Sequence, residues 1–148
     1  MENARCFKTV NAIAPTCLLV IDDEPDVREI VQVSLEYSRS WQVLTAKSGQ
    51  EGLAIAQTQQ PDAILLDMDL NDMDGYGILS ELRHHPKTVH IPVIFLTANR
   101  SVKANEEMQT PELEVHGAIQ KPFDPGLLAN QIEVLLNWQV PSPPITSS

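Results

Sequence analysis

The stretch Cys-Leu-Leu-Val-Ile-Asp-Asp-Glu-Pro, residues 17–25, decides the fold. Five apolar residues followed at once by three acids are typical of a strand that is buried on both faces and ends at a polar edge. Pro25 suits the first position of a helix, and Glu24 before it is a candidate cap. Apolar residues then recur at helical spacing from Val27 to Leu35. The stretch therefore predicts a strand, a short polar turn and a helix.

The same succession of an apolar run and a helical segment recurs along the chain. The predicted strands are 17–21, 41–46, 63–66, 91–96 and 115–120. A helix is expected after each strand; the second begins at a Ser48-Gly49-Gln50-Glu51 capping box, and the fourth is a weak helix at 101–109. Such alternation predicts an α/β fold, a doubly wound five-stranded parallel sheet with helices on both faces.

Length and composition fit a single domain. The chain has 148 residues, of which 43% are apolar and 20% charged, which is ordinary for a globular protein. We expect an N-terminal arm at 1–15, one domain at 16–138 and a C-terminal tail or linker at 139–148. Cys6 and Cys17 cannot build a disulfide scaffold, and we expect both to be free thiols.

The net charge excludes some classes of partner. Acidic residues number 20 and basic residues 10, which gives a net charge of −10. This charge repels phosphate backbones and anionic lipid, so we expect no binding to nucleic acid or to a membrane. Residues 1–15 lack the apolar stretch of a signal peptide, and no apolar run approaches the roughly 20 residues of a membrane span. We therefore expect a soluble, cytoplasmic protein.

Polar residues follow four of the five predicted strands, at the point where each strand ends. They are Asp22 with Asp23, Asp67, Thr97 and Lys121. Because ligands bind beyond the carboxyl ends of parallel strands, we expect these side chains to converge at one edge of the sheet. Close carboxylates repel one another, and a hard divalent cation such as Mg²⁺ relieves that repulsion. A carboxylate can also accept a phosphoryl group, while an ammonium and a hydroxyl hold the remaining oxygens. We interpret the set as a phosphoryl site.

Four segments, in this order, resemble the receiver domain of bacterial two-component response regulators. They are Leu19–Pro25, Leu65–Leu70 with Met73–Gly75, Val93–Ala98 and Lys121–Asp124. The resemblance extends from about residue 16 to residue 138. It implies the flavodoxin-like (βα)5 receiver fold, and a phosphorylation-controlled signalling module rather than an enzyme.

The resemblance also implies a role for each site residue. Asp67 would accept the phosphoryl group from a sensor histidine kinase or a histidine phosphotransfer protein. Asp22 and Asp23 would hold Mg²⁺ beside Asp67, with the backbone carbonyl of Asp69 as a further ligand. Thr97 and Lys121 would contact the phosphoryl group and sense its presence.

Some positions depart from the usual receiver pattern or are variable in it. Ala118 stands where many receivers have an aromatic residue that rotates inward on activation. Asn71-Asp72 stands where family members often have Pro-Gly. Asp69 adds a carboxylate beside the acceptor, where it could bind metal through water or slow an anionic donor.

The resemblance implies a surface that reads out phosphorylation. It would consist of 101–109, 115–120 and 125–138, and it would bind a downstream effector protein. Only a short tail follows residue 138, so we expect a stand-alone receiver; a fragment cut at a linker is the alternative.

Two other functions stay open on the sequence. The first is a Mg²⁺-dependent phosphohydrolase of the haloacid-dehalogenase type, because Asp67-Met68-Asp69, Thr97 and Lys121 mimic its site. In that family, however, the acidic pair comes last, whereas Asp22-Asp23 comes first here. The second is a pseudo-receiver that binds partners without phosphate. Steady turnover of a small phosphoester would distinguish the enzyme from a receiver.

Overall fold

The computed structural model describes residues 16–98 and 115–138. Within these ranges, five strands form one parallel sheet in the order β2-β1-β3-β4-β5. The strands are β1 (Cys17–Ile21), β2 (Gln42–Ala46), β3 (Ala63–Asp67), β4 (Val93–Thr97) and β5 (Ala118–Gln120). The helices are α1 (Pro25–Arg39), α2 (Gly49–Gln59), α3 (Gly75–Arg83) and α4 (Leu128–Leu136), the last preceded by the short 3-10 helix η2 (Pro125–Leu127). The predicted doubly wound, five-stranded parallel sheet is confirmed.

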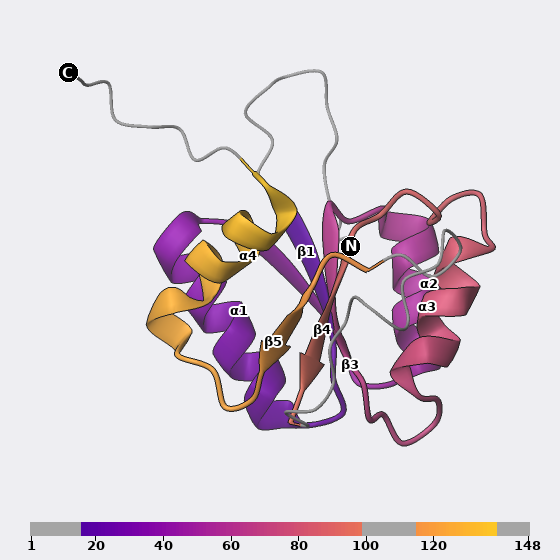
Figure 1. Ribbon diagram of the computed structural model, residues 1–148, viewed down its shortest axis with the longest axis horizontal. Coiled ribbons are helices and arrows are strands. Elements are labelled where there is room, and N and C mark those ends of the chain that lie inside the picture. The colour runs from indigo at the N-terminus through magenta and orange to yellow at the C-terminus, as the bar shows by residue number, and fades with distance from the viewer. Residues whose placement is uncertain (1–15, 99–114, 139–148) are drawn as a thin grey trace, which may run out of the picture.

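Helices cover both faces of the sheet: α1 and α4 lie on one face, and α2 and α3 on the other (Figure 1). Each face has its own apolar cluster, because successive side chains of a strand point in opposite directions. In β1, for example, Leu19 packs in the cluster under α2 and α3, whereas Leu18 packs in the one under α1 and α4. The central strands β1, β3 and β4 are therefore buried at every position, and they are apolar up to the polar residues that end β3 and β4, Asp67 and Thr97.

Local hydrogen bonds account for two of the helix starts. Ser48 caps α2, since its Oγ accepts a hydrogen bond from the backbone N–H of Glu51 at 3.1 Å. This confirms the predicted cap. Glu24 is the N-cap residue of α1, followed by Pro25 in the first turn as predicted, but its side chain makes no capping hydrogen bond. Instead the backbone N–H of Glu24 donates to Asp22 Oδ1 at 2.9 Å, which stabilises the turn before the helix.

Strand β5 is shorter than the predicted 115–120. Gly117 has φ of 149°, a conformation that residues with a side chain rarely adopt, and it interrupts the regular strand before Ala118. Pairing with β4 nevertheless continues, because the backbone N–H of Phe95 donates to the Gly117 carbonyl at 2.9 Å. The weak helix predicted at 101–109 lies outside the described residues.

The state of Cys17 differs from the prediction. Cys17, which is fully buried at the start of β1, is disulfide-bonded, so the prediction of a free thiol is wrong for this residue. The number and spacing of cysteines do not determine whether two thiols come within bonding distance. Cys6 lies outside the described residues.

Among the helices that the structure describes, none is both long and apolar enough to cross a bilayer.

Candidate functional site

Strand β1 delivers two acids to the carboxyl edge of the sheet. Asp22 follows the last residue of β1 and is fully buried. Its backbone is held on both sides: its N–H donates to Ala46 O at 3.0 Å, and its carbonyl accepts from Arg28 Nη1 at 2.8 Å. Asp23 is half-buried beside it. Strand pairing and the Arg28 contact thus fix the point at which β1 presents its acids.

Asp67 is the last residue of β3 and is only 4% exposed. Its Oδ1 accepts a hydrogen bond from the backbone N–H of Asp69 at 3.2 Å. The backbone returns close to this point at Gly75, where a Cβ would lie 2.9 Å from the Met68 Cα. The chain after Asp67 therefore needs glycine at 75, and it folds back tightly against the end of the strand.

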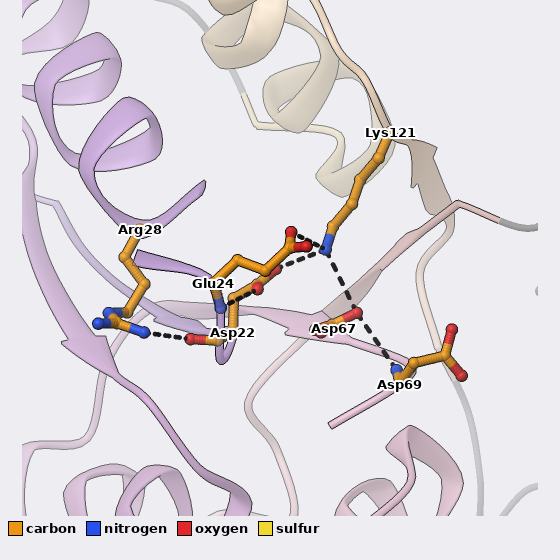
Figure 2. Close-up of polar contacts among 6 residues, drawn as sticks. All are labelled: Asp22, Glu24, Arg28, Asp67, Asp69 and Lys121. Atoms are coloured by element: carbon orange, nitrogen blue, oxygen red, sulfur yellow. Dashed lines mark hydrogen bonds and ion pairs between the residues drawn. The ribbon is translucent and has the colours of Figure 1, made fainter. Parts of the chain in front are cut away.

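Lys121 comes from the segment after β5 and points toward the acids (Figure 2). Its backbone N–H donates to Thr97 O at 2.8 Å, which extends the pairing of β4 and β5. Its Nζ lies 2.8 Å from Asp22 Oδ2, 3.4 Å from Asp67 Oδ1 and 3.5 Å from Glu24 Oε1. One ammonium is therefore shared among three carboxylates.

The acids are arranged in a way that suits a hard divalent cation. One carboxylate oxygen from each of Asp22, Asp23 and Asp67 lies within 4.8 Å of the other two. Asp22 Oδ2 is buried, and the Lys121 ammonium lies 2.8 Å from it. Mg²⁺ prefers oxygen ligands of this kind, and it commonly binds one or two carboxylates together with phosphate oxygens. The donor set fits Mg²⁺.

The pKa values of the two central groups are shifted by this environment. Burial raises the pKa of the Asp67 carboxyl, opposed by the Asp69 hydrogen bond; the Asp22 charge raises it further, and Lys121 opposes this. Burial works to lower the pKa of Lys121, but the hydrogen bond and charge of Asp22, with the charges of Asp67 and Glu24, raise it overall. Lys121 therefore stays a cation, while the ionised form of Asp67 is disfavoured until positive charge arrives.

The structure places the remaining predicted residues at the same edge in different ways. Thr97 ends β4 and is 1% exposed, in register with Gln120 of β5. Asp69 is exposed and its carboxylate is not among the clustered acids, but its backbone directly follows the acceptor strand. Asp22, Asp23 and Asp67 thus lie close together and Lys121 reaches Asp22 and Asp67, whereas Asp69 contacts the site through its backbone.

Sequence reasoning missed the part played by Glu24 and Arg28. The Glu24 carboxylate reaches the shared ammonium of Lys121, and the Arg28 guanidinium holds the backbone of Asp22 (Figure 2). In the sequence, Glu24 cannot be distinguished from an ordinary acid at a helix start, nor Arg28 from an ordinary helix-surface arginine. Their contacts depend on the direction that the chain takes from β1 into α1, and the local sequence pattern does not show that direction.

Comparisons with known proteins identify the class. The family model for the response regulator receiver domain matches residues 18–133. The chain therefore belongs to the response regulator receiver family, whose members are signalling modules of two-component systems. The clustered acids and the lysine belong to the sequence segments that carry the resemblance.

Curated relatives and solved structures agree with this assignment. The probable transcriptional regulator ycf27 of Cyanophora paradoxa is 37% identical over 119 residues, which are 80% of this chain and 47% of the relative. Response regulator Rre1 of Synechocystis is 34% identical over 125 residues, 84% of this chain and 53% of the relative. The chemotaxis response regulator CheY4 of Vibrio cholerae superposes with a TM-score of 0.73 at 25% identity, covering 82% of this chain and 99% of that structure.

The relatives differ from this chain in length. The chain spans about half the length of the curated relatives it matches, and several of these are named as transcriptional regulators. The solved receiver structures, in contrast, are matched almost completely. The predictions of a stand-alone receiver and of no nucleic-acid partner stay predictions.

Proposed function

We propose that the protein is a phosphorylation-controlled signalling module of a two-component phosphorelay, with Asp67 as the phosphoryl acceptor. The observation that carries the proposal is the convergence of groups at one edge of the sheet. Carboxylate oxygens of Asp22, Asp23 and Asp67 lie within 4.8 Å of one another, and Lys121 Nζ lies 3.4 Å from Asp67 Oδ1. Membership of the receiver family supports the same function.

The residues divide the work of binding and positioning. Asp22, Asp23 and Asp67 would hold Mg²⁺, and Asp69 would contribute its backbone carbonyl. Bound Mg²⁺ supplies positive charge that neutralises the phosphoryl oxygens during transfer. The same charge favours the ionised form of Asp67, whose pKa is otherwise raised by burial.

The reaction is the transfer of one phosphoryl group from a phosphohistidine to Asp67. A carboxylate oxygen of Asp67 uses an electron pair to form the new P–O bond. The P–N bond of the donor breaks, and its electron pair stays on the imidazole nitrogen. The Lys121 ammonium exchanges its contact with Asp67 for one with a phosphoryl oxygen, and the Thr97 hydroxyl contacts another.

Two partners follow from this chemistry. The donor is a sensor histidine kinase or a histidine phosphotransfer protein, and the recipient of the signal is a downstream effector protein. The readout surface consists of 101–109, 115–120 and 125–138, of which the first lies outside the described residues. Ala118 is half-buried on this surface, so switching proceeds without the aromatic residue that the family commonly uses there.

The test is intact mass spectrometry after incubation with Mg²⁺ and acetyl phosphate. The unmodified protein should gain one phosphoryl group, and the Asp67→Asn variant should gain none. Glu81→Gln, which changes an exposed acid on α3, serves as a control and should be phosphorylated normally. No gain of mass in the unmodified protein, or an equal gain in Asp67→Asn, would contradict the proposal. Steady turnover of p-nitrophenyl phosphate would favour the phosphohydrolase alternative instead.

A further inference from the structure

The Asp72 side chain ties the loop between β3 and α3 to the start of helix α2. The Asp72 carboxylate accepts hydrogen bonds from two backbone N–H groups, that of Gly49 at 2.9 Å and that of Gln50 at 3.1 Å. These N–H groups belong to the first turn of α2, where they have no partner within the helix and where the helix dipole favours a negative charge. The Gly49 hydrogen bond is the main cause that lowers the pKa of Asp72, so its carboxylate is charged at neutral pH.

Helix α2 already has a cap of its own. Ser48 satisfies the N–H of Glu51, so the helix start does not depend on Asp72 alone. Gly49 lies close to two neighbours, since a Cβ there would lie 2.6 Å from Ile78 Cδ1 of α3 and 3.2 Å from Met73 Sδ of the loop. The Asp72 side chain therefore acts where α2, α3 and the loop pack together. Of these three, only the loop lacks regular secondary structure.

The other end of this loop contacts the acceptor. Asp69 and Asp74 form an isolated antiparallel bridge that closes the loop at its base. From that base the Asp69 N–H donates to Asp67 Oδ1 at 3.2 Å. A short closed loop thus connects the Asp72 tie at its tip to the acceptor carboxylate at its base.

We propose that Asp72 is a positioning residue for the phosphoryl site, which it serves by holding the 69–74 loop against α2. The fixed loop keeps the Asp69 N–H on Asp67 Oδ1 and so holds the backbone of Asp69 next to the acceptor. This inference rests on the proposed function. A Pro-Gly pair, which family members often have at this place, offers no carboxylate for such a tie, so the device belongs to this chain's own Asn71-Asp72.

The test compares Asp72→Ala with the matched control Ser48→Ala. Each variant removes one side-chain cap from the same helix, but only the first releases the loop. Both should lower the midpoint of urea unfolding. Only Asp72→Ala should weaken Mg²⁺ binding, measured by titration calorimetry, by about 3- to 10-fold, somewhat less than is usual for groups that orient metal ligands directly. Its rate of phosphorylation by acetyl phosphate should fall by a similar factor.

A conservative variant separates the carboxylate from the mere presence of a side chain. Asp72→Asn keeps one acceptor oxygen and should give an Mg²⁺ affinity between those of the unmodified protein and Asp72→Ala. The inference is overturned if Asp72→Ala binds Mg²⁺ as tightly as the unmodified protein, or if Ser48→Ala weakens binding equally. If the unmodified protein itself neither binds Mg²⁺ nor accepts a phosphoryl group, the proposed function fails and this inference fails with it.

Discussion

The amino and carboxyl ends of the sheet differ in the partners of their polar side chains. At the amino end, the polar side chains of Asp62 and Thr88 have backbone partners close by. Asp62 Oδ2 accepts the backbone N–H of Cys17 at 2.8 Å, and the buried Thr88 hydroxyl donates to Leu82 O at 2.7 Å. Such groups satisfy the ends of strands and helices, and they stabilise the fold.

At the carboxyl end, like charges are brought together instead. Asp22 and Asp67 are both buried, and the ammonium of Lys121 is shared between them and Glu24. Their mutual repulsion is only partly offset, which costs stability in the absence of a cation. The difference between the ends teaches that the amino end serves folding, whereas the carboxyl end keeps a charge imbalance that a cation and a phosphoryl group can use.

The largest expected effect comes from the sheet interior that joins the two ends. Phe95 is fully buried in β4, and its ring makes an edge-to-face contact with Tyr76 at a centroid distance of 5.5 Å. Phe95→Ala should lower the free energy of unfolding by about 3–5 kcal/mol, because it leaves a cavity. Urea unfolding measures the loss, and Phe95→Leu should recover most of it. A loss below about 1 kcal/mol would mean that packing does not dominate the interior.

A smaller loss is expected at the amino end. Thr88→Ala should lower the free energy of unfolding by about 1–3 kcal/mol, because Leu82 O loses its buried donor. Its Mg²⁺ affinity should match that of the unmodified protein. Thr88→Ser, which keeps the hydroxyl, should retain most of the stability. A change of Mg²⁺ affinity in Thr88→Ala would break the proposed division between the two ends.

The smallest effect has the opposite sign. Asp67→Asn should raise the free energy of unfolding in metal-free buffer at neutral pH, by less than the loss expected for Thr88→Ala, because it removes a charge that burial disfavours. Added Mg²⁺ should stabilise the unmodified protein more than this variant, since one ligand is lost. Thermal unfolding with and without Mg²⁺ measures both quantities. If Asp67→Asn instead lowers the free energy of unfolding in metal-free buffer, repulsion among the carboxylates does not destabilise the carboxyl end.

The stability difference between Asp67→Asn and the unmodified protein should depend on pH. The pKa of Asp67 is raised in the folded state, so folding takes up a proton between the ordinary pKa and the raised one. The unfavourable contribution of Asp67 is therefore fully present above the raised pKa and fades as the pH falls through it. The stability difference between Asp67→Asn and the unmodified protein should shrink from about pH 7 toward about pH 4. A difference that grows as the pH falls would contradict the sign of the shift.

Much of the fold was predictable because it depends on local patterns. Strands β1, β3 and β4 are buried at every position, and their continuous apolar runs are visible in the sequence. Asp22 and Asp67 were predictable as neighbours because each directly ends such a strand. The early end of the regular β5 pairing was missed, since the backbone conformation of Gly117 is not a feature of hydrophobic pattern.

Contacts between distant segments could not be predicted in the same way. Glu24 reaches Lys121, and Asp72 reaches Gly49, only because the sheet order and the loop paths bring these residues together. In sequence, an acid before a helix and an acid in a turn are each explained by local capping. Nothing in the pattern distinguishes such a cap from a side chain that holds another element.

The most direct measurement of the central claim locates the phosphoryl group on the chain. After incubation with Mg²⁺ and acetyl phosphate, borohydride reduction converts an aspartyl phosphate to homoserine, and peptide mapping finds its position. We predict modification at Asp67 alone, and only when Mg²⁺ is present. Homoserine at a different carboxylate, or equal modification in the presence of a chelator, would contradict the account of the carboxyl end as a cation-dependent phosphoryl acceptor.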